Sequence, residues 1–89
     1  MNDSQIRTDD CRHEVLNALY SRRRGAHEAE TIKTVFLSRS NYTLEEVETA
    51  LLDLERLHYA ERADSGMTGS VTVWQITGDG LKFKEKGTR

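Results

Sequence analysis

Residues 42–47, YTLEEV, contain a complete helix-start signal, and it constrains the fold more than any other stretch of the chain. Thr43 and Glu46 have the S/T-x-x-E spacing of a capping box, in which each side chain satisfies a backbone N–H of the other residue. Tyr42 and Val47 occupy the two positions of a hydrophobic staple. The pattern predicts a helix over residues 43–58.

The predicted helix has one apolar face and one charged face. The apolar face, which we expect in the core, is formed by residues at helical spacing: Leu44, Val47, Leu51, Leu54 and His58. The opposite, outer face carries Glu45, Thr49, Leu52, Asp53 and Arg56. Residues 42–57 hold five acids and one base, so the question is what such an outer face can bind.

Two further helices are predicted before this one. Val15, Leu16, Leu19 and Tyr20 give an apolar stripe on a first helix that we expect to begin at Thr8. Three arginines, Arg22, Arg23 and Arg24, are expected in its last turn, with Gly25 as the C-cap. A second helix is expected from about residue 29 to residue 39, with one side formed by Ala29, Ile32, Val35 and Phe36.

The last third of the chain predicts a β-hairpin followed by a short helix. YAERA and VTVWQIT are rich in β-branched or aromatic residues, and DSGMTGS between them has the composition of a turn. Alternation along the strand places Trp74 and Ile76 on one face and Val73 on the other. Thr77 is expected to cap a last helix that carries Leu81 and Phe83.

Length and composition predict one small soluble domain. The chain has 89 residues, of which 36% are hydrophobic and 31% are charged. No apolar run approaches the roughly 18 residues that a membrane helix needs, and the first ten residues lack the apolar region of a secretory signal. We therefore expect a cytoplasmic protein with a flexible N-terminus (residues 1–7), one domain (residues 8–84) and a polar C-terminal tail (residues 85–89).

No stretch of the sequence has the pattern of a catalytic or metal site. His13, His27 and His58 have no second histidine or cysteine at zinc-ligand spacing, which favours surface positions for them. Cys11 lies beside Arg12 and His13, so an activated thiolate competes with a partly buried, unreactive thiol, and we favour the second. We expect no enzymatic activity, no metal and no cofactor.

The order of three helices and a hairpin resembles the small winged helix-turn-helix domains of bacterial and phage regulators. The resemblance covers roughly residues 8–84 and rests on TLEEVETALLDLERLHYAER and on WQITGDGLKF, which looks like the end of the wing in MarR- and PadR-type repressors. It implies a mainly helical α+β fold with three helices, a two-stranded wing and a short C-terminal helix. It also implies that residues 43–58 form the recognition helix of a DNA-binding, transcriptional-regulator-like protein.

The charge distribution qualifies this expectation. Residues 43–64 hold seven acids and two bases, a net charge of −5, and carboxylates near DNA oppose binding because phosphate contacts dominate affinity. We therefore expect contact with double-stranded DNA mainly through backbone phosphates. The candidate residues are Arg22, Arg23, Arg24, Lys33, Arg39, Thr43, Thr49, Arg56, Lys82 and Lys84.

The alternative is a winged-helix module for protein–protein interaction or dimerisation that uses the acidic helix 43–58 and does not bind DNA. Leu52 is an apolar residue on a polar face and can anchor a partner, although isolated surface leucines are common. Candidates for the interface are Glu45, Leu52, Asp53, Tyr20 and Phe83. A homodimer is compatible with both hypotheses, and the small size would suit a phage-related regulator.

Overall fold

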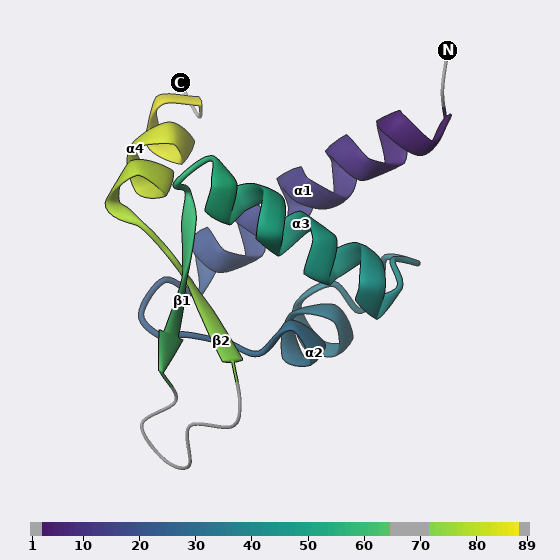
Figure 1. Cartoon of the computed structure of the whole chain (residues 1–89), viewed down its shortest axis with the longest axis horizontal. Helices are drawn as coiled ribbons and strands as arrows, with labels where there is room; N and C mark the ends of the chain where they lie inside the picture. Colours follow the sequence, from purple (N-terminus) through teal and green to yellow (C-terminus); the bar gives the residue numbers. More distant parts are fainter. Residues whose placement is uncertain (1–2, 65–71, 88–89) are drawn as a thin grey trace.

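The computed structural model of the protein describes residues 3–64 and 72–87 (Figure 1). Its elements are α1 (Asp3–Ser21), α2 (Ala29–Thr31), the π-helical turn η1 (Ile32–Phe36), α3 (Leu44–Arg56), β1 (Ala60–Asp64), β2 (Thr72–Ile76) and α4 (Gly78–Gly87). The predicted order of helices and hairpin is confirmed, while most of the expected DSGMTGS turn lies outside the described residues. No described helix is both long and apolar enough to cross a membrane.

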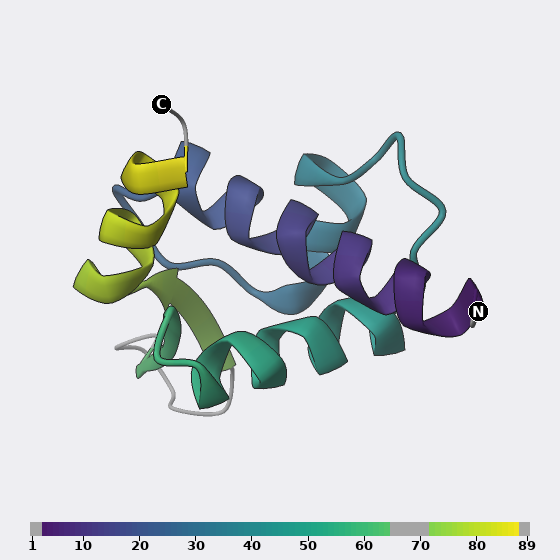
Figure 2. The same ribbon diagram turned by 90° about the horizontal axis from the view of Figure 1, so that it is seen from above.

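The core lies between α1, α3, η1 and the hairpin. Figure 2 shows α1 and α3 close together near the N-terminus and diverging toward α4 and the hairpin. The side chains that fill the space between these elements are almost completely buried: Val15, Leu19, Ile32, Val47, Leu51 and Leu54. The predicted apolar stripes of the first and third helices therefore meet in one core.

The start of α3 is built as the sequence predicts. The Glu46 N–H donates to Thr43 Oγ1 at 3.1 Å, and the Thr43 N–H donates to Glu46 Oε1 at 2.8 Å, which completes the capping box. Tyr42 and Val47 are both buried on either side of it, as a hydrophobic staple requires. Two orphan N–H groups of the helix are thus satisfied locally.

The end of α3 corrects the position of His58, which the spacing placed on the buried face. His58 is exposed and has a φ of 68°. Its N–H donates to the Glu55 carbonyl at 3.0 Å, and the Tyr59 N–H donates to the Leu54 carbonyl at 2.9 Å. This is a Schellman motif, which needs a left-handed residue just after the helix, so the chain reverses here and His58 leaves the apolar stripe.

The second helix ends earlier than expected and contains a π-turn. The Leu37 N–H donates to the Ile32 carbonyl at 2.9 Å, five residues back, so this turn holds one residue more than an α-helical turn. The extra residue shifts the register. Leu37 becomes buried, whereas Val35, which a 3.6-residue period placed on the core side, is 59% exposed.

The first helix begins at Asp3, five residues before the expected start, and ends at Ser21. The three arginines that follow form a turn outside the helix, which we call the arginine turn (Arg22, Arg23 and Arg24). Gly25 belongs to this turn, where its N–H donates to the Arg22 carbonyl, and is not the C-cap. Beyond this turn, the backbone of His27 pairs with that of Trp74, with hydrogen bonds of 2.8 and 2.7 Å.

The hairpin register places Arg62 opposite Trp74 and Ala60 opposite Ile76. Trp74 and Ile76 are both buried, so the predicted strand faces are confirmed. Thr77 caps α4 as expected, because the Gly80 N–H donates to Thr77 Oγ1 at 3.0 Å. The helix then continues to Gly87, so it includes part of the expected polar tail.

The core assignment of α3 can be tested by truncating its side chains. Leu54 is only 2% exposed, so Leu54→Ala is expected to lower the free energy of unfolding by roughly 2–5 kcal/mol. Thr43→Ala removes the cap and is expected to cost about 0.5–2 kcal/mol. Chemical denaturation measures both values. A loss for Leu54→Ala no larger than that for the exposed control Thr49→Ala would contradict the packing described above.

A matched pair of glycines tests the contact between α4 and the end of α3. A Cβ at Gly80 would lie 2.3 Å from the Tyr59 carbonyl oxygen and 2.7 Å from Ile76 Cγ1, whereas a Cβ at Gly78 would meet nothing within 4 Å. Gly80→Ala is expected to destabilise the protein by about 1–3 kcal/mol, the usual cost of overpacking. Gly78→Ala is expected to leave its melting temperature unchanged or raise it. Equal effects in thermal denaturation would argue against this close approach.

Candidate nucleic-acid interface

The outer face of α3 is the surface that a winged-helix protein would present to a groove. Glu45, Thr49 and Arg56 are exposed on it, and Leu52 is 43% exposed. Asp53, predicted on the same face, instead has a side chain that is only 19% exposed and lies 3.6 Å from Arg12 of α1 and 3.4 Å from Arg56. The outer face is therefore less acidic than the sequence indicates.

Arginines neutralise most of the carboxylates of α3. Besides Asp53, Glu46 pairs with Arg7 of α1 at 2.5 Å, and Glu55 pairs with Arg62 of β1 at 3.0 Å. The guanidinium of Arg62 makes two hydrogen bonds to Glu55 and also lies 5.5 Å from the ring centroid of Trp74. Among the described residues, only Glu45 and Glu48 of α3 have no ion-pair partner.

Arg7 is a structural residue that the sequence analysis missed. It donates to both Glu46 carboxylate oxygens and to the Asn41 carbonyl, and its guanidinium lies 5.1 Å from the ring centroid of Tyr42. The hydrogen bond from Arg7, together with that from the Thr43 backbone, lowers the pKa of Glu46 from 4.5 to about 2. The partner is 39 residues away in sequence, so no local pattern could reveal it.

The candidate DNA-binding residues fall into separate groups. Thr43, Thr49 and Arg56 lie on α3, although the hydroxyl of Thr43 is already engaged in the cap. Lys33 lies in η1 and Arg39 in the turn that leads to α3, and neither pairs with a carboxylate of the described residues. The Lys84 ammonium of α4 donates to Asn17 Oδ1, while Lys82 is exposed on the same helix.

The arginine turn lies apart from these groups. Figure 2 shows the C-terminal end of α1, which leads into the arginine turn, on the side of the molecule away from α3. Arg22 stacks on Phe36, the last residue of η1, with its Cζ 4.8 Å from the ring centroid. The outer face of α3 and the arginine turn are therefore two different surfaces.

Tyr20 and Phe83, predicted as interface residues, also have partners within the chain. The rings of Phe83 and Tyr59 stack at 4.6 Å, and the guanidinium of Arg23 lies 4.8 Å from the ring centroid of Tyr20. Phe83 remains 47% exposed beside Leu57, which is 49% exposed. Both border a hollow of about 170 Å³ between α1, α3 and α4.

Cys11 has the environment of an unreactive thiol. Its side chain is buried, and Sγ donates to the Glu46 carbonyl at 3.6 Å. Burial, with the nearby Glu46 and Glu14 carboxylates, raises the pKa of Cys11 to about 11. The thiol is therefore protonated at neutral pH, which agrees with the second alternative drawn from the sequence. Within the described ranges, no three metal-ligating side chains gather at one point.

Comparison with known proteins identifies the architecture. No family model matches the chain, and no curated protein matches it. Among solved structures, the chain is similar to a variant of MepR from a multidrug-resistant clinical isolate of S. aureus, a winged-helix regulator of the MarR type. The TM-score is 0.68 at 23% identity over 89% of this chain. The protein has a winged-helix fold.

In this fold, α2 with η1 and α3 form the helix-turn-helix, and β1 with β2 forms the wing. The similarity covers 53% of the MepR chain, so this protein spans about half the length of its structural neighbour. The predicted resemblance to MarR-type winged helices is confirmed at the level of the fold.

The ion pair between Arg7 and Glu46 is expected to stabilise the folded protein against unfolding at low pH. Because the pKa of Glu46 is lowered in the folded state, its ionised form stabilises the fold above pH 4.5, and this contribution is lost as the pH falls toward 2. In Arg7→Gln, the pKa of Glu46 is expected to rise toward 4.5, and acid unfolding should begin at higher pH. A carboxyl ¹³C NMR titration measures this pKa directly.

The control for this experiment is Arg62→Gln, which removes an ion pair of α3 that does not involve Glu46. It is expected to leave the titration of Glu46 unchanged. If Arg7→Gln also leaves the pKa of Glu46 unchanged, the ion pair does not hold that carboxylate in solution.

Proposed function

We propose that this protein is a winged-helix DNA-binding module of the transcriptional-regulator type. The outer face of α3 enters a groove of duplex DNA, and Lys33, Arg39 and Arg56 contact phosphates. The proposal is supported most by the neutralisation of Glu46, Asp53 and Glu55 by arginines of α1, α3 and β1. Arg56 and Arg62 are already counted in the net charge of residues 43–64, so the pairing lowers the repulsion of DNA through the two added charges of Arg7 and Arg12.

The remaining outer face has groups that can contact bases. Thr49 can pack its methyl group against the methyl of thymine, and Glu45 and Glu48 can accept hydrogen bonds from the N4 amino group of cytosine. These two carboxylates weaken the attraction to phosphates, so the affinity depends on the cations around them. Residues 65–71, which follow β1 and precede β2 in the sequence, contain no acid and no base.

One observation favours the alternative, a protein-binding role for the same face. Leu52 is 43% exposed on α3, and Val35 is 59% exposed on η1, the other helical element of the helix-turn-helix. Exposed apolar residues beside unpaired Glu45 and Glu48 would suit a partner with apolar and basic side chains. If the face binds a protein, Leu52→Asp should disrupt the complex with that partner. If the face binds DNA, the same substitution should only weaken the affinity for DNA.

A salt titration of labelled duplexes tests the proposed function. Three phosphate contacts predict a slope of about −3 in log affinity against log salt, since each neutralised phosphate contributes about −0.9. Lys33→Glu and Arg39→Glu are expected to weaken binding to all sequences alike. Lys86→Glu is the matched control, because Lys86 is exposed on α4 outside the proposed interface and changes the net charge equally.

The glutamates provide a second arm of the same experiment. Glu45→Gln and Glu48→Gln are expected to leave binding unchanged or to tighten it, because they remove repulsion. Loss of sequence preference in these variants would mean that the acids read bases. Absence of binding to every duplex at low salt would reject DNA binding and favour the protein-binding role.

A further inference from the structure

The arginine turn surrounds a hollow that the proposed DNA contact does not use. It has a volume of about 400 Å³ and is lined by Ser21, Arg22, Arg23, Arg24, Gly25 and His27. Three of these six residues are cationic, and none is a carboxylate. The volume is within the range of sites that hold small molecules, which is about 300–1,000 Å³.

The cations of this hollow have no carboxylate partner among the described residues, which sets them apart from most other arginines of the chain. Arg7, Arg12, Arg56 and Arg62 each pair with an Asp or Glu. The arginine turn instead leaves three adjacent exposed positive charges without a carboxylate partner, and this concentration of charge would attract an anion.

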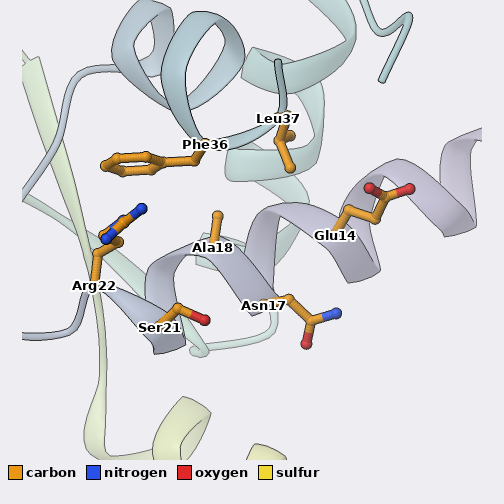
Figure 3. Close-up of a pocket in the computed structure, with 7 residues that line it drawn as sticks. All are labelled: Glu14, Asn17, Ala18, Ser21, Arg22, Phe36 and Leu37. Atoms are coloured by element: carbon orange, nitrogen blue, oxygen red, sulfur yellow. The ribbon is translucent and has the colours of Figure 1, made fainter. Parts of the chain in front are cut away.

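Two of these arginines are held in place by aromatic rings. The Cζ of Arg22 lies 4.8 Å from the centroid of Phe36, a contact visible in Figure 3. The Cζ of Arg23 lies 4.8 Å from the centroid of Tyr20, and its Nη1 donates to the Tyr20 carbonyl at 2.9 Å. Stacking occupies the face of a guanidinium and leaves its in-plane N–H donors available to an oxyanion. The side chains are thus partly ordered before any ligand arrives, which lowers the entropic cost of binding.

The hollow is joined both to η1 and to the base of the wing. The ring of His27 meets Phe36 edge-to-face at 4.8 Å, and His27 Nε2 lies 3.1 Å from the Arg22 carbonyl. The backbone of His27 exchanges two hydrogen bonds with Trp74 of β2. A ligand that orders this turn therefore acts on the end of η1 and on the base of the wing together.

We propose that the arginine turn is a binding site for phosphate groups, separate from the outer face of α3. Guanidinium groups recognise phosphate through paired N–H donors, and three adjacent ones suit an anion with several negative charges. The phosphate groups come from a small polyphosphorylated molecule or from the backbone of a nucleic acid. The site stands independently of the proposed DNA contact through α3, but its effect on that contact rests on the proposed function.

Isothermal titration with inorganic pyrophosphate tests the site without DNA. Saturable binding at one equivalent is expected, and Arg23→Gln/Arg24→Gln should weaken it by tenfold or more, as expected from the loss of charge-assisted hydrogen bonds. Within the described part of the chain, the Arg24 side chain makes no hydrogen bond, ion pair or ring contact, so Arg24→Gln alone serves as a second variant that should fold normally. Lys86→Gln/Lys82→Gln, which removes two charges from exposed positions outside the hollow, should change the affinity less than twofold.

Backbone NMR supplies a readout that general charge attraction would not produce. Pyrophosphate is expected to shift the amide signals of residues 21–27, of Phe36 and of Trp74, and to leave those of Thr49 and Leu52 unchanged.

If only duplex DNA shifts these signals, and the effect is lost in Arg23→Gln/Arg24→Gln but kept in Lys33→Glu, the phosphate source is the nucleic-acid backbone. If neither ligand binds, or the control variant loses as much affinity as the arginine variant, the site does not exist. Failure of Lys33→Glu to weaken DNA binding would reject the proposed α3 contact while leaving this result intact.

Discussion

One carboxylate both starts α3 and ties that start to α1. Glu46 accepts the backbone N–H of Thr43 and the guanidinium of Arg7, so it starts the helix and joins that start to α1. Arg7 also donates a hydrogen bond to the Asn41 carbonyl, and its guanidinium lies over the ring of Tyr42. These contacts fix the segment that precedes α3 as well. The first turn of α3 is therefore held against α1 by an interaction at the edge of the outer face, and the buried residues Val47, Leu51 and Leu54 fix the rest of the helix. The low pKa of Glu46 follows from the same contacts, and it keeps this junction charged far into the acid range.

Because of ion pairing, the charge that α3 presents at its surface differs from the charge counted along the sequence. A net charge of −5 over residues 43–64 suggests an acidic helix. However, the carboxylates of Glu46, Asp53 and Glu55 form ion pairs with neighbouring arginines. Each pair is partly exposed and contributes little to stability on its own. Their larger effect is on the surface, since they leave Glu45 and Glu48 as the acids that an incoming partner would meet. The arginines that make these pairs come from α1, from β1 and from α3 itself, so the charge of the outer face depends on several elements of the fold.

The sequence predicts those features that are encoded within a few neighbouring residues. The capping box of Thr43, the cap of Thr77 and the alternation of Trp74 and Ile76 were all predicted correctly, because each is a short-range pattern with a single geometric solution. The π-turn that buries Leu37 was not predicted, since a periodicity analysis assumes 3.6 residues per turn. His58 was placed wrongly for a related reason: the apolar spacing continues past Arg56, whereas the backbone reverses there.

The candidate binding residues were less predictable, and the arginines explain why. In the sequence, Arg7, Arg12 and Arg62 look the same as Arg24 and Arg39. Among the described residues, the first three pair with carboxylates and the last two do not. Whether a cation is available to a ligand depends on contacts between residues that are distant in the chain, such as Arg7 and Glu46. A positive charge already paired with a carboxylate must lose that partner before it can bind a phosphate, so it contributes less to binding than an unpaired one. The cations available to a phosphate are therefore those that folding leaves uncompensated, and among the described residues they lie around η1, in the arginine turn and on α4.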